Sequence, residues 1–246
     1  MTVYLCDDTP DGFYSAVFRA YGDKNTDADV STLAAYQGTL DTVFVRVQTD
    51  AAHALRVKNA VCRCGGYKAC KDVESALRSD CPEKAGIAFR YVKRLLKEKR
   101  DISRCYSFDE VMPFGTLVDK VWTERHRFTG FLRFEETAGG ILYAAYTPDN
   151  DITDILAPHF VRRLNMPFVI HDKRRGRFAV WNGKELADFY TDAAPDIKLS
   201  DAEKQIESLW KGYFKAVDLK ERPHKKQQDG YLPRRYRKNM CEFGED

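Results

Sequence analysis

Apolar and β-branched positions in the N-terminal part of the chain predict two strands and two helices. Residues 3–6 and 42–48 are rich in such side chains, which is typical of strands. Thr9, followed by Pro, is typical of a helix start, because Thr caps free N–H groups and Pro suits the first turn. A second helix is expected to begin at residues 49–50 and to end at the glycine pair 65–66.

Further helices are expected at residues 68–78, after Asp80 and at 114–127, so that residues 50–127 form a helical subregion. Downstream, short apolar runs separated by turn residues indicate strands, and capping signals indicate two more helices. The expected elements are strands at 131–134, 141–146, 168–172 and 178–181, a helix from Asp149 to about Leu164, and a helix with a capping box at Ser200.

Together these elements predict an α+β fold, in which helices pack with a mostly antiparallel sheet and the C-terminal segment is helical and basic. We expect one domain over residues 1–217 and a basic, aromatic C-terminal segment over residues 218–246. The sequence has no basic start with an apolar centre typical of a signal peptide, and no apolar run of membrane-spanning length. A cytoplasmic protein is therefore expected.

Charge is unevenly distributed along the chain, although the net charge is only +3. Residues 1–50 carry eight Asp and three basic residues, whereas residues 211–238 carry ten Lys or Arg and three acidic residues. Trp210 directly precedes this basic C-terminal stretch, and Tyr231 and Tyr236 lie among its cations. Rings stack on bases and cations neutralise phosphates, so the pattern favours single-stranded nucleic acid as a partner. The alternative is a segment that wraps the domain and leaves its charges in water.

The cysteines predict neither a disulfide framework nor a metal site. Their number, seven, is odd, and a cytoplasmic compartment is reducing. Zinc sites commonly have two close pairs of ligands. Cys62 and Cys64, taken with Cys70 and Cys81, lack a second close pair. We therefore expect buried or incidental thiols, and we predict no metal and no cofactor.

A second group of cations surrounds Gly130, in the segment from Glu124 to Phe134. A turn at Gly130 between a helix and a strand would hold His126, Arg127 and Arg133 near one another at a sheet edge. Arg binds planar anions through a bidentate fork, so this cluster suits a phosphate or a carboxylate. The alternative is a structural salt-bridge cluster with Glu124.

General acid-base chemistry is a further hypothesis for the central histidines, although the reaction, if any, is not indicated. His171 and Asp172 are adjacent on an expected strand, so we expect their side chains to point to opposite faces and not to form a catalytic couple with each other. The common signatures of nucleotide and serine hydrolases are absent from the sequence. The candidate catalytic residues are His126, Arg133, His159 and Asp172.

An ordered series of short motifs over nearly the full length resembles a bacterial family of domains of unknown function assigned to DNA metabolism or repair. The motifs include residues 11–21, 124–134, 148–149, 159–163, 170–174, 209–211 and 233–236. Members are typically encoded beside a radical-SAM protein of DNA modification or repair, and a related domain occurs fused to uracil-DNA glycosylase-like modules. The resemblance implies a process and a partner, but no reaction.

The leading hypothesis is therefore a DNA repair protein that binds DNA, single-stranded or damaged, and acts with a radical-SAM enzyme. One alternative is a stand-alone, glycosylase-like hydrolase that acts on damaged DNA. Another is a protein-binding adaptor without DNA affinity. The residues expected to contact nucleic acid are Arg127, Arg133, Arg162, Arg163, Lys173, Arg174, Trp210, Lys211, Arg222, Arg234, Arg235 and Tyr236.

Overall fold

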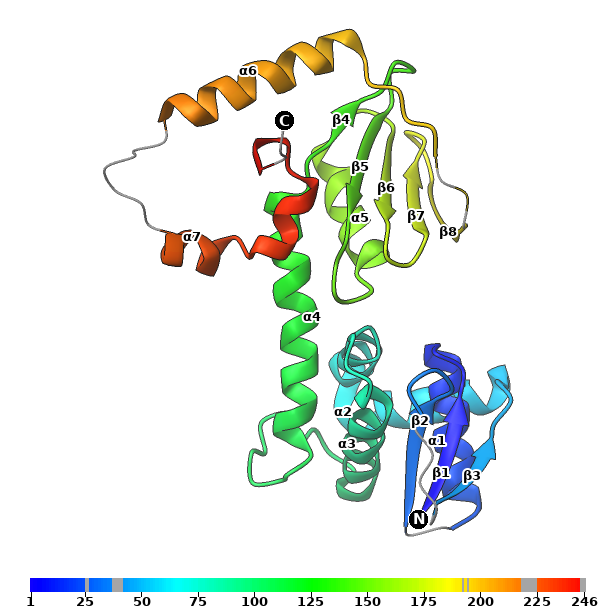
Figure 1. The fold of residues 1–246 in the computed structure, drawn as a ribbon. Coiled ribbons are helices and arrows are strands. Elements are labelled where there is room, and N and C mark those ends of the chain that lie inside the picture. The colour runs from blue at the N-terminus through cyan, green and yellow to red at the C-terminus, as the bar shows by residue number, and fades with distance from the viewer. Residues whose placement is uncertain (25–26, 37–41, 192, 194, 218–224, 244–246) are drawn as a thin grey trace. The chain divides into compact units, whose positions relative to one another are not determined.

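A computed structural model describes residues 1–24, 27–36, 42–191, 193, 195–217 and 225–243. The chain divides into two compact units, residues 1–123 and 124–246 (Figure 1). The domain boundary expected after residue 217 adjoins residues 218–224, which lie outside the described residues, as does Arg222. That boundary stays a prediction.

The first unit combines a small parallel sheet with helices. Its strands pair in the order β2-β1-β3, and both pairings are parallel. The expectation of a mostly antiparallel sheet is wrong here, because a helix between β1 and β2 returns the chain to run in the same direction. The elements are β1 (Thr2–Cys6), α1 (Pro10–Gly22), β2 (Ala28–Thr32), β3 (Val43–Arg46), α2 (Ala51–Ala76), α3 (Lys84–Glu98) and the first half of α4 (Val111–Phe131).

Local signals in this unit are confirmed. The Thr9 hydroxyl accepts a hydrogen bond from the Gly12 N–H at 3.0 Å, and the Asp50 carboxylate accepts one from the His53 N–H at 2.8 Å. Each therefore caps its helix as expected. Gly66 has φ of +78°, a conformation that few residues other than Gly adopt, and it interrupts α2 at the expected place.

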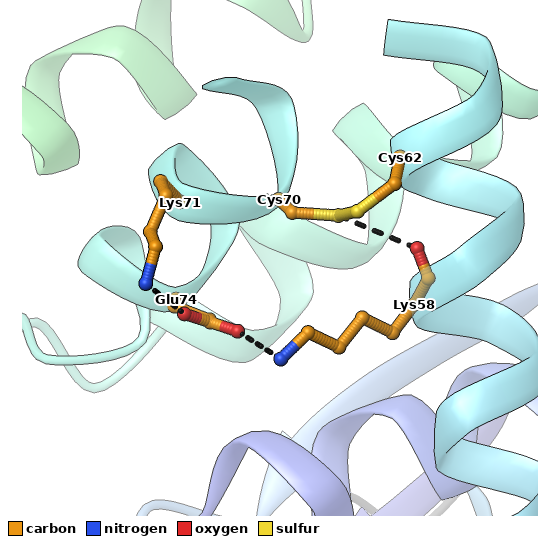
Figure 2. Close-up of a disulfide and its surroundings, with 5 residues drawn as sticks. All are labelled: Lys58, Cys62, Cys70, Lys71 and Glu74. Atoms are coloured by element: carbon orange, nitrogen blue, oxygen red, sulfur yellow. Dashed lines mark hydrogen bonds and ion pairs between the residues drawn. A yellow bond between two sulfur atoms is a disulfide. The ribbon is translucent and has the colours of Figure 1, made fainter. Parts of the chain in front are cut away.

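A disulfide joins Cys62 to Cys70 across this interruption of α2 (Figure 2). The expectation of free thiols at these two positions is wrong. The kink at Gly66 folds the second half of the helix back, which brings the two Cα atoms to 5.5 Å, within disulfide range. Two ion pairs lie beside the bond, because Glu74 contacts Lys58 at 2.7 Å and Lys71 at 3.6 Å.

Reduction of this disulfide is expected to lower the free energy of unfolding by about 2–3 kcal/mol, because the bond closes a short loop in the unfolded chain. Urea denaturation with and without dithiothreitol measures the difference. Cys62→Ser with Cys70→Ser should reproduce it, and the double variant should no longer respond to reductant. An equal response of wild type and double variant would contradict the assignment.

The second unit is built on a five-stranded mixed sheet in the order β4-β5-β6-β7-β8. The β5–β6 pair is parallel and the other pairs are antiparallel. The parallel pair arises because α5 connects β5 to β6. The elements after α4 are β4 (Glu135–Glu136), β5 (Leu142–Tyr146), α5 (Thr153–Arg163), β6 (Phe168–Asp172), β7 (Arg177–Trp181), β8 (Leu186–Tyr190), α6 (Asp201–Val217), α7 (Lys225–Tyr231), η1 (Arg234–Asn239) and η2 (Cys241–Phe243).

Several expectations for this unit are confirmed and three are wrong. The strand expected at residues 131–134 does not form, because α4 extends to Phe131 and the next strand, β4, begins only at Glu135. The β6–β7 hairpin forms, and the Ser200 hydroxyl accepts from the Glu203 N–H at 3.0 Å. Gly130, however, lies inside α4, which ends at Phe131, because an interior Gly costs a helix only about 1 kcal/mol. Asp149 does not cap α5, which begins at Thr153. Its N–H donates to Glu124, and its carboxylate forms an ion pair with Arg235.

Helix α5 lies against one face of this sheet (Figure 1). Side chains at alternate positions of β6, including Ile170 and Asp172, are buried on that side. Among the described helices, none is both long and apolar enough to cross a bilayer.

Candidate nucleic-acid interface

A buried carboxylate on α4 holds three distant segments of the second unit together. Glu124 is only 3% exposed, and its oxygens accept from the Asp149 N–H at 2.8 Å and the Asn150 N–H at 2.7 Å. The Asn150 side-chain amide donates at 2.6 Å, and the Tyr236 hydroxyl at 2.8 Å. A buried charge is tolerated when it is hydrogen-bonded in this way. Glu124 therefore fixes the loop before α5 and the C-terminal η1 against α4.

Tyr236 anchors the C-terminal segment. Its side chain is 2% exposed, and its ring packs edge-on against Phe128, with the ring centroids 4.7 Å apart. Burial, as the first cause, raises the pKa of Tyr236 to about 12, so the hydroxyl stays a donor to Glu124 at neutral pH. The neighbouring Arg235 lies over the Tyr236 ring, 4.9 Å from its centroid, and points a guanidinium N–H at the hydroxyl oxygen at 3.2 Å.

Three guanidinium groups meet at Asp149. Arg235 forms an ion pair with the Asp149 carboxylate at 2.9 Å, and Arg174 donates to the Asp149 carbonyl oxygen at 3.1 Å. Arg175 donates to the same carbonyl oxygen. We call Arg174, Arg175 and Arg235 the arginine cluster. It joins the β6–β7 turn to the C-terminal segment, which lie far apart in the sequence.

Asp172 builds the turn that carries two of these arginines. It is fully buried at the end of β6 and accepts from the N–H groups of Arg174 at 2.9 Å and Arg175 at 3.3 Å. The Arg175 side chain also donates to it at 3.0 Å. Burial raises the pKa of Asp172, and the hydrogen bonds oppose that shift. These contacts give Asp172 a structural role in positioning the arginine cluster.

The other three catalytic candidates lie in separate surroundings. Arg133 forms an ion pair with Glu203 at 3.0 Å, and His126 is exposed on α4. Burial, followed by the charges of nearby arginines, lowers the pKa of His159 on α5. Within the described ranges, no hydrogen bond or ion pair joins any two of His126, Arg133, His159 and Asp172. The expected cluster of His126, Arg127 and Arg133 lacks its turn, because α4 continues past Gly130.

The remaining candidates for nucleic-acid contact are spread over α5, α6 and the C-terminal segment. Arg162 and Arg163 lie at the end of α5, where Arg163 donates to the Thr129 carbonyl oxygen at 3.1 Å. Lys211 forms an ion pair with Glu207 at 3.3 Å on α6. Arg234 forms an ion pair with Asp229 at 2.9 Å. Arg127 is half-buried on α4, Lys173 is exposed in the β6–β7 turn and Trp210 is exposed on α6.

Sequence reasoning missed Arg175 and the central role of Glu124. A signal for Glu124 was present, because it occupies the apolar stripe of its helix, three residues after the buried Val121 and four before the buried Phe128. A carboxylate at such a position is buried and needs donors. Nothing comparable marks Arg175 within its basic turn.

A match to a known protein family covers most of these residues. A family model described as a domain of unknown function, DUF4130, matches residues 82–242, from α3 through the C-terminal segment. The matched range includes Glu124, Asp149, Asp172 and the arginine cluster. No curated protein matches the chain. The chain therefore belongs to the DUF4130 family of domains of unknown function.

Proposed function

We propose that the protein binds DNA through the arginine cluster and functions in DNA repair or metabolism with a radical-SAM partner. The observation that carries this proposal is the meeting of Arg174, Arg175 and Arg235 at Asp149. Arg175 and Arg235 form ion pairs with the carboxylates of Asp172 and Asp149, and the charge of the buried Glu124 also acts on Arg235. Arg174 and Arg235 are exposed, so their guanidinium groups are accessible to an anionic ligand. Arginine pairs well with phosphate, because its planar fork matches two phosphate oxygens.

The cluster is held in place before any ligand arrives. The Arg235 side chain is 55% exposed, yet its segment is fixed by the buried Tyr236. Arg174 is exposed while its backbone N–H is bound to the buried Asp172. Binding therefore loses less side-chain freedom than it would with unattached arginines. The sequence allowed two interpretations of the C-terminal segment, nucleic-acid binding and wrapping of the domain. The two are compatible, because an aromatic side chain can anchor the segment while neighbouring cations stay in water.

The process and the protein partner rest on the family resemblance. Four of the segments that carry it meet around Glu124 and Asp149, namely residues 124–127, 148–149, 170–174 and 233–236. We propose that a radical-SAM enzyme acts on the DNA that this unit holds. The hydrolase and adaptor alternatives stay predictions.

DNA binding by the purified full-length protein is expected to fall steeply with salt. Fluorescence anisotropy with a labelled oligonucleotide, repeated from 50 to 300 mM salt, gives the slope of log K against log salt. In the double variant Arg174→Ala, Arg235→Ala, the slope should become shallower by about 1.4, because each lost contact to single-stranded DNA contributes about 0.7.

The matched control is Lys97→Ala with Lys184→Ala, which removes two exposed cations from elsewhere in the chain. Its slope and affinity should stay close to those of wild type, and thermal melts verify that both double variants fold. An equal loss of DNA affinity in both double variants would show that binding depends on overall charge and not on the arginine cluster. Absence of DNA binding by wild type would overturn the proposal.

A further inference from the structure

A row of aromatic rings crosses the sheet of the second unit, with one ring from each of four adjacent strands. The His171 ring stacks on Phe178, with centroids 4.0 Å apart and planes 15° from parallel. Phe178 stacks in turn on Phe189, at 5.6 Å and 8°. Tyr143 completes the row through a hydrogen bond of 2.7 Å between its hydroxyl and His171 Nδ1. We call these four residues the aromatic row.

The aromatic row lies on the sheet face opposite α5. Strand side chains alternate between faces, and Asp172 and Ile170 are buried on the α5 side, so His171 points to the other. The registers place Phe178 opposite His171 and Phe189 opposite Phe178, which keeps all three rings on one face. In Figure 1, α5 lies behind the sheet, and no described helix of this unit crosses the front of β6 and β7.

The last aromatic ring of the row, Phe189, is partly exposed to solvent. Phe189 lies on β8, the edge strand of the sheet, and is 46% exposed. Its inner ring face meets Phe178, so its exposed part is available for another flat group. The rings stack along the sheet at close to the spacing of the strands, and a further planar group would continue the same stack.

Positive charge lies next to the His171 position of the row. His171 is one residue from the end of β6, so the basic turn 173–175 follows it directly. Lys173 is exposed, and its charge, together with burial as the larger cause, lowers the pKa of His171. The His171 ring is therefore held neutral as a stacking surface, while the cations that a phosphate would meet lie beside it.

We propose that the aromatic row and the basic turn 173–175 bind single-stranded DNA, with an unpaired base stacked on Phe189 and the backbone phosphates on Lys173 and the arginine cluster. The inference rests on the proposed function and adds the strand state and the base contact. Duplex DNA is a poor ligand for such a site, because its bases already stack on one another and present no free face.

The test compares three ligands by anisotropy at fixed salt: a single-stranded oligonucleotide, the same strand with abasic residues throughout, and its duplex. Wild type is expected to prefer the base-containing single strand. Phe189→Ala should weaken that binding roughly 5- to 150-fold, which is the range for loss of one base–aromatic stack, and should leave binding to the abasic strand unchanged.

Phe189→Trp keeps a flat ring and should restore affinity for the base-containing strand. Tyr106→Ala removes an exposed ring from the first unit and should have no effect. Equal affinity of wild type for abasic and base-containing strands, or unchanged binding by Phe189→Ala, would overturn this inference while leaving salt-dependent DNA binding intact. Failure to bind any of the three ligands would instead refute the proposed function and this inference together.

Discussion

Replacing Glu124 with Ala is expected to lower the free energy of unfolding by about 3–5 kcal/mol, because several buried donors lose their acceptor at once. The N–H groups of Asp149 and Asn150 and the Asn150 amide all donate to this carboxylate. Each buried polar group left without a partner costs about 1–3 kcal/mol. Urea denaturation followed by circular dichroism measures the change.

Two further variants separate this effect from a loss of charge. Glu124→Gln keeps one acceptor oxygen and should lose less stability than Glu124→Ala. Glu185→Ala removes an exposed carboxylate from the β7–β8 turn and should change stability by less than about 0.5 kcal/mol. A loss below about 1 kcal/mol for Glu124→Ala would show that the carboxylate does not organise these segments.

Replacing Tyr236 with Ala is expected to cost about 3–5 kcal/mol and to release the C-terminal segment. The ring is buried against Phe128, and its hydroxyl reaches Glu124, which is 112 residues earlier in the chain. Limited proteolysis should therefore cleave residues 232–243 much faster in the variant than in wild type. DNA affinity should fall as well, because Arg235 loses the support that fixes it beside Asp149.

Tyr236→Phe provides the control, because it keeps the ring and removes only the hydroxyl. It should cost about 1–3 kcal/mol and leave the segment resistant to protease. Because Glu124 and Tyr236 share a hydrogen bond, the double variant Glu124→Ala, Tyr236→Ala should be less destabilised than the sum of its parts. Equal protease sensitivity of wild type and Tyr236→Ala would contradict the anchoring role.

Local features of this fold could be read from the sequence because neighbouring residues determine them. The caps at Thr9, Asp50 and Ser200 each involve a hydrogen bond across three residues, so residue type and spacing suffice. The break at Gly66 could be predicted from the glycine pair 65–66, because Gly readily adopts the positive φ found there. The β6–β7 hairpin follows from two strand-like runs around a short turn.

Features that depend on distant parts of the chain could not be read in this way. The parallel pairings β1–β2 and β5–β6 depend on how a helix packs after the first strand has formed. Strand β8 was missed because it lies at the sheet edge and all five of its residues are exposed, so that no apolar alternation marks it. The Cys62–Cys70 bond depends on the angle of the kink between the two cysteines.

In the candidate site, too, local features could be predicted from the sequence and long-range contacts could not. The basic and aromatic character of the C-terminal stretch follows from its composition. The position of Glu124 on the apolar stripe of its helix follows from its spacing to neighbouring apolar residues. The pairing of Arg235 with Asp149 and the bond between Tyr236 and Glu124 join residues far apart in sequence. A single sequence carries no signal for such contacts, because many other cations and rings in the chain could have filled the same positions.

Photo-crosslinking tests the central claim most directly, since it identifies the residues that contact DNA. A single-stranded oligonucleotide carrying 5-iodouracil is irradiated with the full-length protein, and the crosslinked peptides are identified by mass spectrometry. We predict crosslinks within residues 168–191, which contain the basic turn and Phe189, and within residues 233–237 of the C-terminal segment. Crosslinks confined to residues 1–123 would contradict the account.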